Sequence, residues 1–172
     1  MIAQTFSKEV GVVLSFQTQL PFDRLEEWAD LRRLPLKQQL VQLRDPAVRN
    51  TLVDAAVHGT YDKTALGAEA PAPDFHAIRL MDRPGNQNPT IAEVAAKRRC
   101  HPVDAMIDLS LERDLERFFY QVMGNTSEAE TLELLRHPNS VITFSDSGAH
   151  VRQLINSSIQ THLLYCEEPA SD

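Results

Sequence analysis

The spacing of apolar residues along the chain predicts where strands and helices lie. A run rich in β-branched residues over 10–16 predicts a buried strand. From Asp23 onward apolar residues recur every three to four positions, which predicts a helix that breaks at Pro35 and restarts. Asp45-Pro46 and Gly59 are the start and stop signals expected of the next helix.

The second half of the chain continues the alternation of strands and helices. Thr90 with Glu93, and Ser127 with Glu130, have the spacing of capping boxes at helix starts. The further elements expected are a loop over 60–74, a half-exposed strand over 75–80, helices over 90–99 and from 101 onward, a strand over 118–122, a helix over 127–137, a buried strand over 141–144 and a last helix over 152–164. Strands alternating with helices predict an α/β fold with a mostly parallel sheet.

Composition narrows the class of protein without indicating an activity. The chain has 172 residues, 17 Lys+Arg and 24 Asp+Glu, so the formal charge is 17 − 24 = −7. This acidity disfavours nucleic-acid binding, which usually relies on a basic patch. No apolar run is long enough to span a membrane, and the first residues do not resemble a signal peptide. With only Cys100 and Cys166, the composition predicts a reduced, cytoplasmic protein of one domain.

The strongest candidate for chemistry follows the predicted strand over 141–144. That strand leads directly into Ser145, Asp146, Ser147, Gly148 and, two residues later, His150. In parallel α/β folds reactive groups gather where strands end, so Asp146 would be a carboxylate at such an edge. A structural alternative stays open, in which Asp146 caps the following helix and His150 orients the loop by a hydrogen bond.

Other kinds of site are disfavoured by the residues present. Asp146-Ser147-Gly148 resembles the loop of an aspartic protease, but that chemistry needs two aspartates and a strand-rich fold. A serine nucleophile is disfavoured because the chain has no G-x-S-x-G motif. The six histidines form no metal-binding motif, and His101 and His137 each precede a proline, which favours a local structural role.

Three segments together resemble a known family. Residues 135–151, with the sequence LRHPNSVITFSDSGAHV, resemble the eighth barrel strand of the amidohydrolase superfamily. The resemblance is to its N-acyl-D-amino-acid deacylase (D-aminoacylase-like) branch, where the pattern HP…SDAGAHV is typical. Residues 34–49 and 90–109 resemble two further segments of that branch. The resemblance extends over about residues 10–163, with Ser147 standing where alanine is usual.

The resemblance implies a (β/α)8 barrel that carries one or two zinc ions at the carboxyl ends of its strands. Metal-activated water would hydrolyse the acyl amide of an N-acyl-D-amino acid, a C–N bond that is not a peptide bond. Asp146 would take the proton from that water and could also contact the metal. Ser145, Ser147, Gly148 and His150 would shape the loop around it.

The sequence also departs from the family. The histidine pair of the first barrel strand and the metal ligands of the middle strands have no counterpart here, and a full barrel needs about 250 residues. We therefore expect residues 1–164 to form a helix-rich part of a (β/α)8 barrel, its last strands and helices, followed by a frayed tail over 165–172. Such a fragment would retain little activity and no zinc. The alternative is a non-catalytic interaction protein that self-associates through exposed strand edges.

Overall fold

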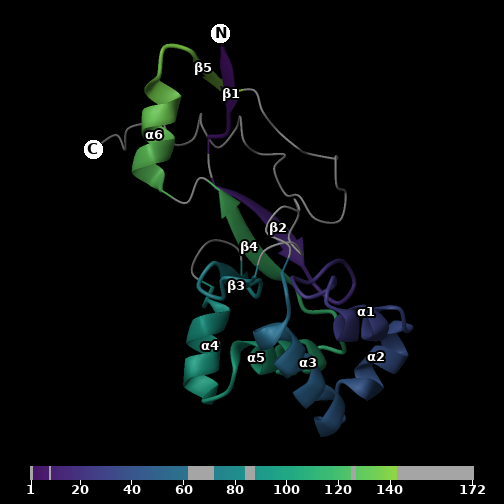
Figure 1. Ribbon diagram of the computed structural model, residues 1–172. Helices are drawn as coiled ribbons and strands as arrows, with labels where there is room; N and C mark the ends of the chain where they lie inside the picture. Colours follow the sequence, from purple (N-terminus) through teal and green to yellow (C-terminus); the bar gives the residue numbers. More distant parts are fainter. Residues whose placement is uncertain (1, 8, 62–71, 84–87, 125–126, 143–172) are drawn as a thin grey trace. The chain divides into compact units, whose positions relative to one another are not determined.

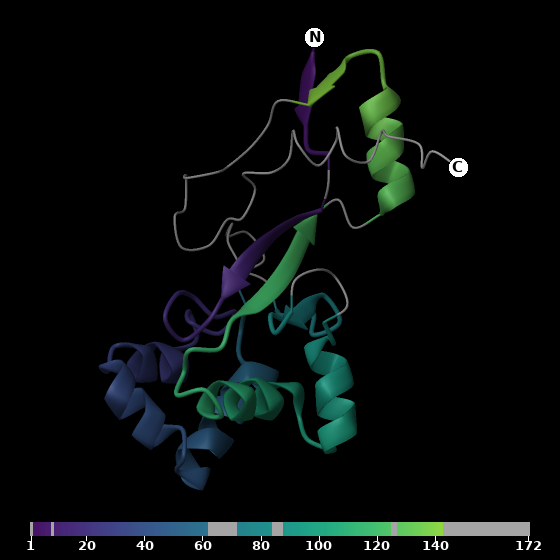
Figure 2. The same ribbon diagram turned by 180° about the vertical axis from the view of Figure 1, so that it is seen from behind.

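The computed structural model describes residues 2–7, 9–61, 72–83, 88–124 and 127–142. Its contacts divide the chain into two compact units, residues 13–121 and residues 1–12 with 122–172. Residues 13–121 are called the inserted unit, because they interrupt the other unit in sequence. Residues 1–12 with 122–172 are called the outer unit. The described residues form a mixed α/β fold with six helices and two small open sheets (Figures 1 and 2).

The inserted unit contains most of the helices. They are α1 (Glu26–Arg32), α2 (Leu36–Gln42), α3 (Pro46–His58), α4 (Ile91–Arg98) and α5 (Pro102–Leu111). Three strands, β2 (Val10–Leu14), β3 (Ile78–Leu80) and β4 (Phe119–Gly124), form a sheet in the order β2-β4-β3. Residues 10–12 of β2 and 122–124 of β4 belong to the outer unit. The helices and strands expected from the apolar spacing therefore exist close to their predicted positions.

The predicted helix signals act as expected. The Asp45 carboxylate accepts a hydrogen bond from the Ala47 backbone at 2.8 Å and caps α3. Thr90 and Glu93 form both bonds of a capping box at the start of α4, at 3.2 and 2.9 Å. Pro35 separates α1 from α2, because a proline has no N–H to continue the first helix. These local signals confirm the predicted starts of α3 and α4 and the break at Pro35, whereas α1 begins at Glu26 rather than near Asp23.

An aromatic and aliphatic core lies inside the inserted unit. Trp28 and Phe22 are almost fully buried, and their ring centroids lie 4.5 Å apart. The Trp28 indole N–H donates to the Leu52 carbonyl at 2.9 Å, so its one polar group is satisfied. Phe119 and Ile78 bring the sheet into the same set of buried side chains.

The expectation of a mostly parallel sheet is wrong for β3 and β4. They pair antiparallel, with Leu80 opposite Phe119 and Ile78 opposite Gln121. If β3 and β4 were parallel, the connection between them would cross back over the sheet, and β4 would begin beside the start of β3. Here α4 and α5 both lie between the strands, and β4 begins beside the end of β3 instead.

The predicted strand over 75–80 is also shorter than expected. The Asp74 side chain accepts from the His76 N–H at 2.9 Å, and the Asp74 carbonyl accepts from the Ala77 N–H at 2.9 Å. This turn occupies the residues before Ile78, because an aspartate side chain competes with the strand for backbone donors.

Besides residues 10–12 of β2 and 122–124 of β4, the described part of the outer unit contains a parallel strand pair with one helix. β1 (Ala3–Thr5) pairs in parallel with β5 (Ser140–Ile142), and α6 (Glu128–Arg136) packs against β5. The expectation that β5 is buried is wrong: Val141 is 40% exposed, and the residues beside it are half-buried. The reason is that α6 is the one described helix that packs against this strand pair.

Several predictions fall on residues that the structure does not describe. They concern most of the predicted loop over 60–74 and everything from residue 143 onward, including the last predicted helix. In the described ranges, no helix has the length and apolar character needed to cross a membrane.

Candidate functional site

The candidate site follows the parallel strand pair of the outer unit. Thr5 lies opposite Ile142, so β1 and β5 end at the same edge. In parallel sheets this carboxyl edge is where functional loops begin. Ser145, Asp146, Ser147, Gly148 and His150 follow β5 along the chain, and all of them lie outside the described residues.

A turn at the end of α6 fixes where β5 begins. His137 Nδ1 accepts a hydrogen bond from the Asn139 N–H at 3.1 Å, and the His137 carbonyl accepts from the Ser140 N–H at 3.0 Å. The Asn139 carbonyl accepts from the Ala3 N–H at 2.7 Å. The turn therefore connects the helix, the first residue of β5 and the first residue of β1.

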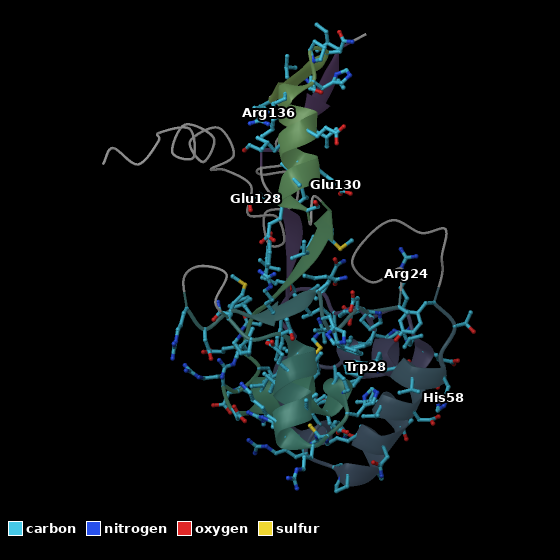
Figure 3. The ribbon with its side chains drawn as sticks, turned by 90° about the vertical axis from the view of Figure 1, so that its left-hand side faces the viewer. Arg24, Trp28, His58, Glu128, Glu130 and Arg136 are labelled. Carbon is cyan, nitrogen blue, oxygen red and sulfur yellow. The ribbon has the colours of Figure 1, made fainter. Side chains whose placement is uncertain are left out.

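The helix that leads to this turn has favourable ends. Ser127 Oγ accepts a hydrogen bond from the Glu130 N–H at 3.3 Å, which is one of the two bonds of the predicted capping box. Glu128 and Glu130 lie in the first turn of α6 and Arg136 in the last (Figure 3). Acidic residues at a helix start and basic residues at its end interact favourably with the helix dipole.

Two polar side chains, Ser7 and Glu9, follow β1 along the chain. Ser7 is buried and Glu9 half-buried, and both come after Thr5, the end of β1 at the carboxyl edge. A hydroxyl and a carboxylate are both able to bind polar groups of a ligand. No motif or turn signal surrounds them, so only the pairing of β1 with β5 draws attention to them.

A charged cluster along α5 is a second candidate. Asp104, Asp108 and Glu112 repeat every four residues and so share one helix face. Arg49 on α3 pairs with Asp104 at 2.8 Å and with Asp108 at 2.7 Å. Burial lowers the pKa of Arg49, but its hydrogen bonds with Asp108 and Asp104 outweigh that effect, so the pKa is raised. The cluster holds α3 against α5.

Two further arginines complete this cluster. Arg98 pairs with Glu112 at 2.8 Å, and this hydrogen bond raises the pKa of Arg98. Arg117 has a buried side chain that pairs with Asp82, lies 3.9 Å from Glu112 and donates to the Leu109 carbonyl at 3.4 Å. Because every acid of the cluster has an arginine partner, its role is structural.

Cys100 lies close to the same cluster. Burial raises the pKa of its thiol, and the negative charges of Asp108 and Asp104 raise it further. A raised pKa keeps the thiol protonated, whereas a nucleophile or metal ligand needs the thiolate. Cys100 is therefore not a candidate nucleophile.

A third polar cluster surrounds Arg32. Its guanidinium donates to Asp23 at 3.0 Å, to the Gln39 side-chain oxygen at 3.0 Å, to the Thr18 carbonyl at 2.9 Å and to the Phe16 carbonyl. These bonds hold the loop that follows β2. With its donors used within the protein, Arg32 is a structural residue rather than a ligand-binding one.

The side chains of His58, His101 and His137 have local partners, in agreement with the prediction for His101 and His137. His101 Nδ1 accepts from the Val103 N–H at 3.2 Å and caps α5. His58, exposed on α3, lies 3.0 Å from Asp54 (Figure 3 labels His58). His150 and His162 lie outside the described ranges.

The described residues do not fit a zinc site. No group of three or more histidine, cysteine, aspartate or glutamate side chains comes together among them. Zinc in proteins takes at least three such ligands. The one carboxylate that the resemblance assigns to a metal, Asp146, lies beyond the described part of the chain.

Comparison with known proteins gives distant relatives only. Uncharacterized proteins of Mycobacterium tuberculosis and Mycobacterium bovis are each 24% identical to this chain over 166 residues. The match covers 88% of this chain and 27% of each relative, so the chain spans about a quarter of the length of these proteins. No family model and no solved structure matches.

Proposed function

We propose that this chain carries the catalytic aspartate of an amidohydrolase of the D-aminoacylase-like branch. The substrate would be an N-acyl-D-amino acid, hydrolysed at its acyl amide. One observation carries the proposal. β1 and β5 pair in parallel and end at the same carboxyl edge, and Asp146 follows β5 in sequence. The sequence resemblance over residues 135–151 supplies the reaction class.

The described part of the outer unit supports a barrel segment. Two parallel strands with a helix packed against the second are the repeating unit of a (β/α)8 barrel. In the proposed barrel, β1 and β5 are neighbouring strands, α6 is the helix between them, and the inserted unit is an insertion in the connection.

Exposed apolar side chains on α6 support the proposal that further strands and helices flank this part of the barrel. Thr131 is buried, whereas Leu132 and Leu134 are 42% and 45% exposed. By helical geometry the two leucines lie on opposite flanks of Thr131. A helix within a layer of helices has neighbours on both flanks, and it needs apolar residues there. The chain spans about a quarter of the relatives' length, so those proteins are long enough to contain further strands.

Asp146 would act as a general acid and base. A carboxylate takes a proton from the attacking water and returns it to the leaving nitrogen, so the C–N bond breaks and a free amine forms. Since the described residues do not fit zinc, any metal ligands would come from elsewhere, and no step is assigned here to a metal. Ser145, Ser147, Gly148 and His150 would shape the loop.

The test is the substitution Asp146→Asn in the 172-residue chain and in any longer natural protein that contains it, assayed on N-acetyl-D-amino acids and their L enantiomers. We expect turnover of the D substrates to fall by about a thousandfold, within the range for loss of a general acid-base group. Asp54→Asn is the matched control, because it makes the same change at an exposed position on α3. An Asp146→Asn enzyme with unchanged turnover would contradict the proposal.

The exposed flanks favour a second candidate, a non-catalytic protein that binds other chains. Leu132, Leu134 and Val141 are all at least 40% exposed, and strand edges and apolar faces promote association. Size-exclusion chromatography with metal analysis separates the two candidates. A metal-free oligomer without turnover supports this second function, and an active monomer rejects it.

A further inference from the structure

One arginine of the inserted unit is half-buried and has no partner among the described residues. Arg32, Arg49 and Arg117 are half-buried or buried, and each of them pairs with an aspartate. Arg79, on β3, is also half-buried, but its guanidinium makes no hydrogen bond or ion pair within the described ranges. A charge that loses part of its water without gaining a partner is unfavourable. An anion from another molecule would offset this cost.

Arg79 belongs to a group of four side chains on one face of the sheet. β3 and β4 pair antiparallel with Arg79 opposite Tyr120. The Met81 N–H donates to the Phe118 carbonyl at 3.1 Å, which continues the same register. Because side chains alternate along a strand, these four share the face opposite the buried Phe119. This group, here called the Arg79 block, therefore lies on the side of the strands that faces away from the core.

The Arg79 block combines a cation with exposed apolar surface. Met81 is 39% exposed and Phe118 is 38% exposed, although side chains of these types are usually buried. A guanidinium binds a carboxylate through two parallel hydrogen bonds, and the thioether and the ring offer apolar contact. The kind of group that complements this face is a carboxylate with an apolar side chain close to it.

The spacing along β3 indicates which kind of segment fits. Met81 follows Arg79 by two residues, which is about 7 Å along a strand. Four residues of a helix span about 6 Å, so positions i and i+4 on one helix face match this spacing. Faces of sheets are covered by helices or further sheets, whereas small molecules bind in concave pockets. A helix with a glutamate at i and a leucine at i+4 therefore fits the Arg79 block.

We propose that the Arg79 block binds an amphipathic helix of a partner protein. A glutamate of that helix pairs with Arg79, and a leucine four residues away packs on Met81 and Phe118. The charge of Arg79 and the exposed apolar pair beside it are complementary to such a helix. The inference does not rest on the proposed function, because it uses residues of the inserted unit alone and gives Asp146 no part.

The test is a double-mutant cycle on the 172-residue chain with two helical peptides. Both are alanine-based and about 16 residues long, and they have leucine at i+4 and either glutamate or glutamine at i. NMR titration of the amide resonances of 78–81 and 118–121 measures their affinities. We expect the glutamate peptide to bind about fivefold more tightly, as for an exposed ion pair. Arg79→Gln is expected to remove this difference and to leave the affinity of the glutamine peptide unchanged.

Arg44→Gln is the matched control. Arg44 is an exposed arginine that follows α2, so its loss should leave both affinities unchanged. Phe118→Ala should weaken both peptides, because both use the apolar contact. Equal weakening of the two peptides by Arg79→Gln, or binding of neither peptide at millimolar concentration, would overturn the proposal. So would free phenylpropionate that binds as tightly as the glutamate peptide, because the occupant would then be a small acid rather than a helix.

Urea unfolding separates binding from an effect on the folded chain. Arg79→Gln should leave the unfolding midpoint unchanged, because no described bond of the guanidinium is lost. Arg49→Gln should lower the midpoint, because the ion pairs with Asp104 and Asp108 are lost. An equally lowered midpoint for Arg79→Gln would show that Arg79 has its partner within the chain, and it would overturn the proposal.

Discussion

The inserted unit and the described part of the outer unit differ in how they bury apolar side chains. All of the largest fully buried side chains lie between Leu14 and Phe119, within the inserted unit. In the outer unit, Leu132, Leu134 and Val141 are each at least 40% exposed. Both units have short strands and capped helices, so local structure does not account for the difference.

The difference indicates that the described residues of the inserted unit close a core of their own, whereas the described residues of the outer unit do not. Besides its core, the inserted unit has ion pairs between arginines and acidic residues of α5, and these pairs connect α5 to α3 and α4. The described part of the outer unit has a two-stranded sheet with one helix against it, besides residues 10–12 and 122–124 of β2 and β4. Two strands alone are marginally stable, so the packing of α6 against β5 contributes to the stability of this part.

The largest expected effect comes from Trp28→Ala. Removal of a fully buried tryptophan costs about 3–5 kcal/mol, and here it also leaves the Leu52 carbonyl without its indole donor. Leu132→Ala, on the exposed flank of α6, is expected to cost at most about 1 kcal/mol. Urea unfolding followed by far-UV circular dichroism measures both.

The Leu132 variant decides whether the comparison holds. A loss of stability as large as that of Trp28→Ala would mean that the flank of α6 is packed in solution. The outer unit would then be closed, and the contrast between the two units would disappear.

A smaller effect, with the opposite sign, is expected at Gln121. This side chain is 5% exposed, and its Oε1 has no hydrogen-bond partner among the described residues. A buried acceptor without a partner costs about 1–3 kcal/mol, so Gln121→Leu is expected to raise the free energy of unfolding by about 1 kcal/mol or more.

Gln39 provides the control for Gln121. It is 3% exposed, but it accepts from Arg32 and donates to the Leu34 carbonyl at 2.7 Å. Gln39→Leu is therefore expected to destabilise the protein, because buried partners lose their bonds. If the two leucine variants change stability in the same direction, the missing partner of Gln121 is not the cause.

Local signals explain what the sequence predicted well. Asp45, Thr90 and His101 each precede a helix and use their side chains to satisfy its first N–H groups. Such bonds join residues a few positions apart, so their spacing is visible in the sequence. The antiparallel pairing of β3 with β4 joins Leu80 to Phe119 across two helices, and apolar spacing contains no information about it.

The site was harder to predict than the fold. Asp146 was found from its sequence pattern, and it stays a prediction, since the residues around it lie outside the described ranges. The pairing of β1 with β5 joins residues from nearly opposite ends of the described chain. Ser7 and the His137 turn are connected with this edge only through that pairing, which no local pattern indicates.

The smallest expected effect concerns the response of the inserted unit to alkaline pH. Burial raises the pKa of Tyr61 to about 12 from an ordinary 10.0, and its hydroxyl donates to the Ala56 carbonyl at 2.8 Å. A raised pKa in the folded state stabilises the protein fully below the unfolded pKa, and this contribution disappears as pH rises towards the folded one. The free energy of unfolding should therefore fall between pH 10.0 and about 12.

Tyr61→Phe isolates this contribution from that of the other tyrosines. The variant loses one hydrogen bond, so we expect about 1 kcal/mol less stability at neutral pH. Above pH 10.0 its stability should fall less steeply than that of the wild type, because the raised pKa is gone. Urea unfolding at several pH values measures both curves. Parallel curves would show that Tyr61 is as accessible in the folded protein as in the unfolded chain, and that the core does not extend as far as the end of α3.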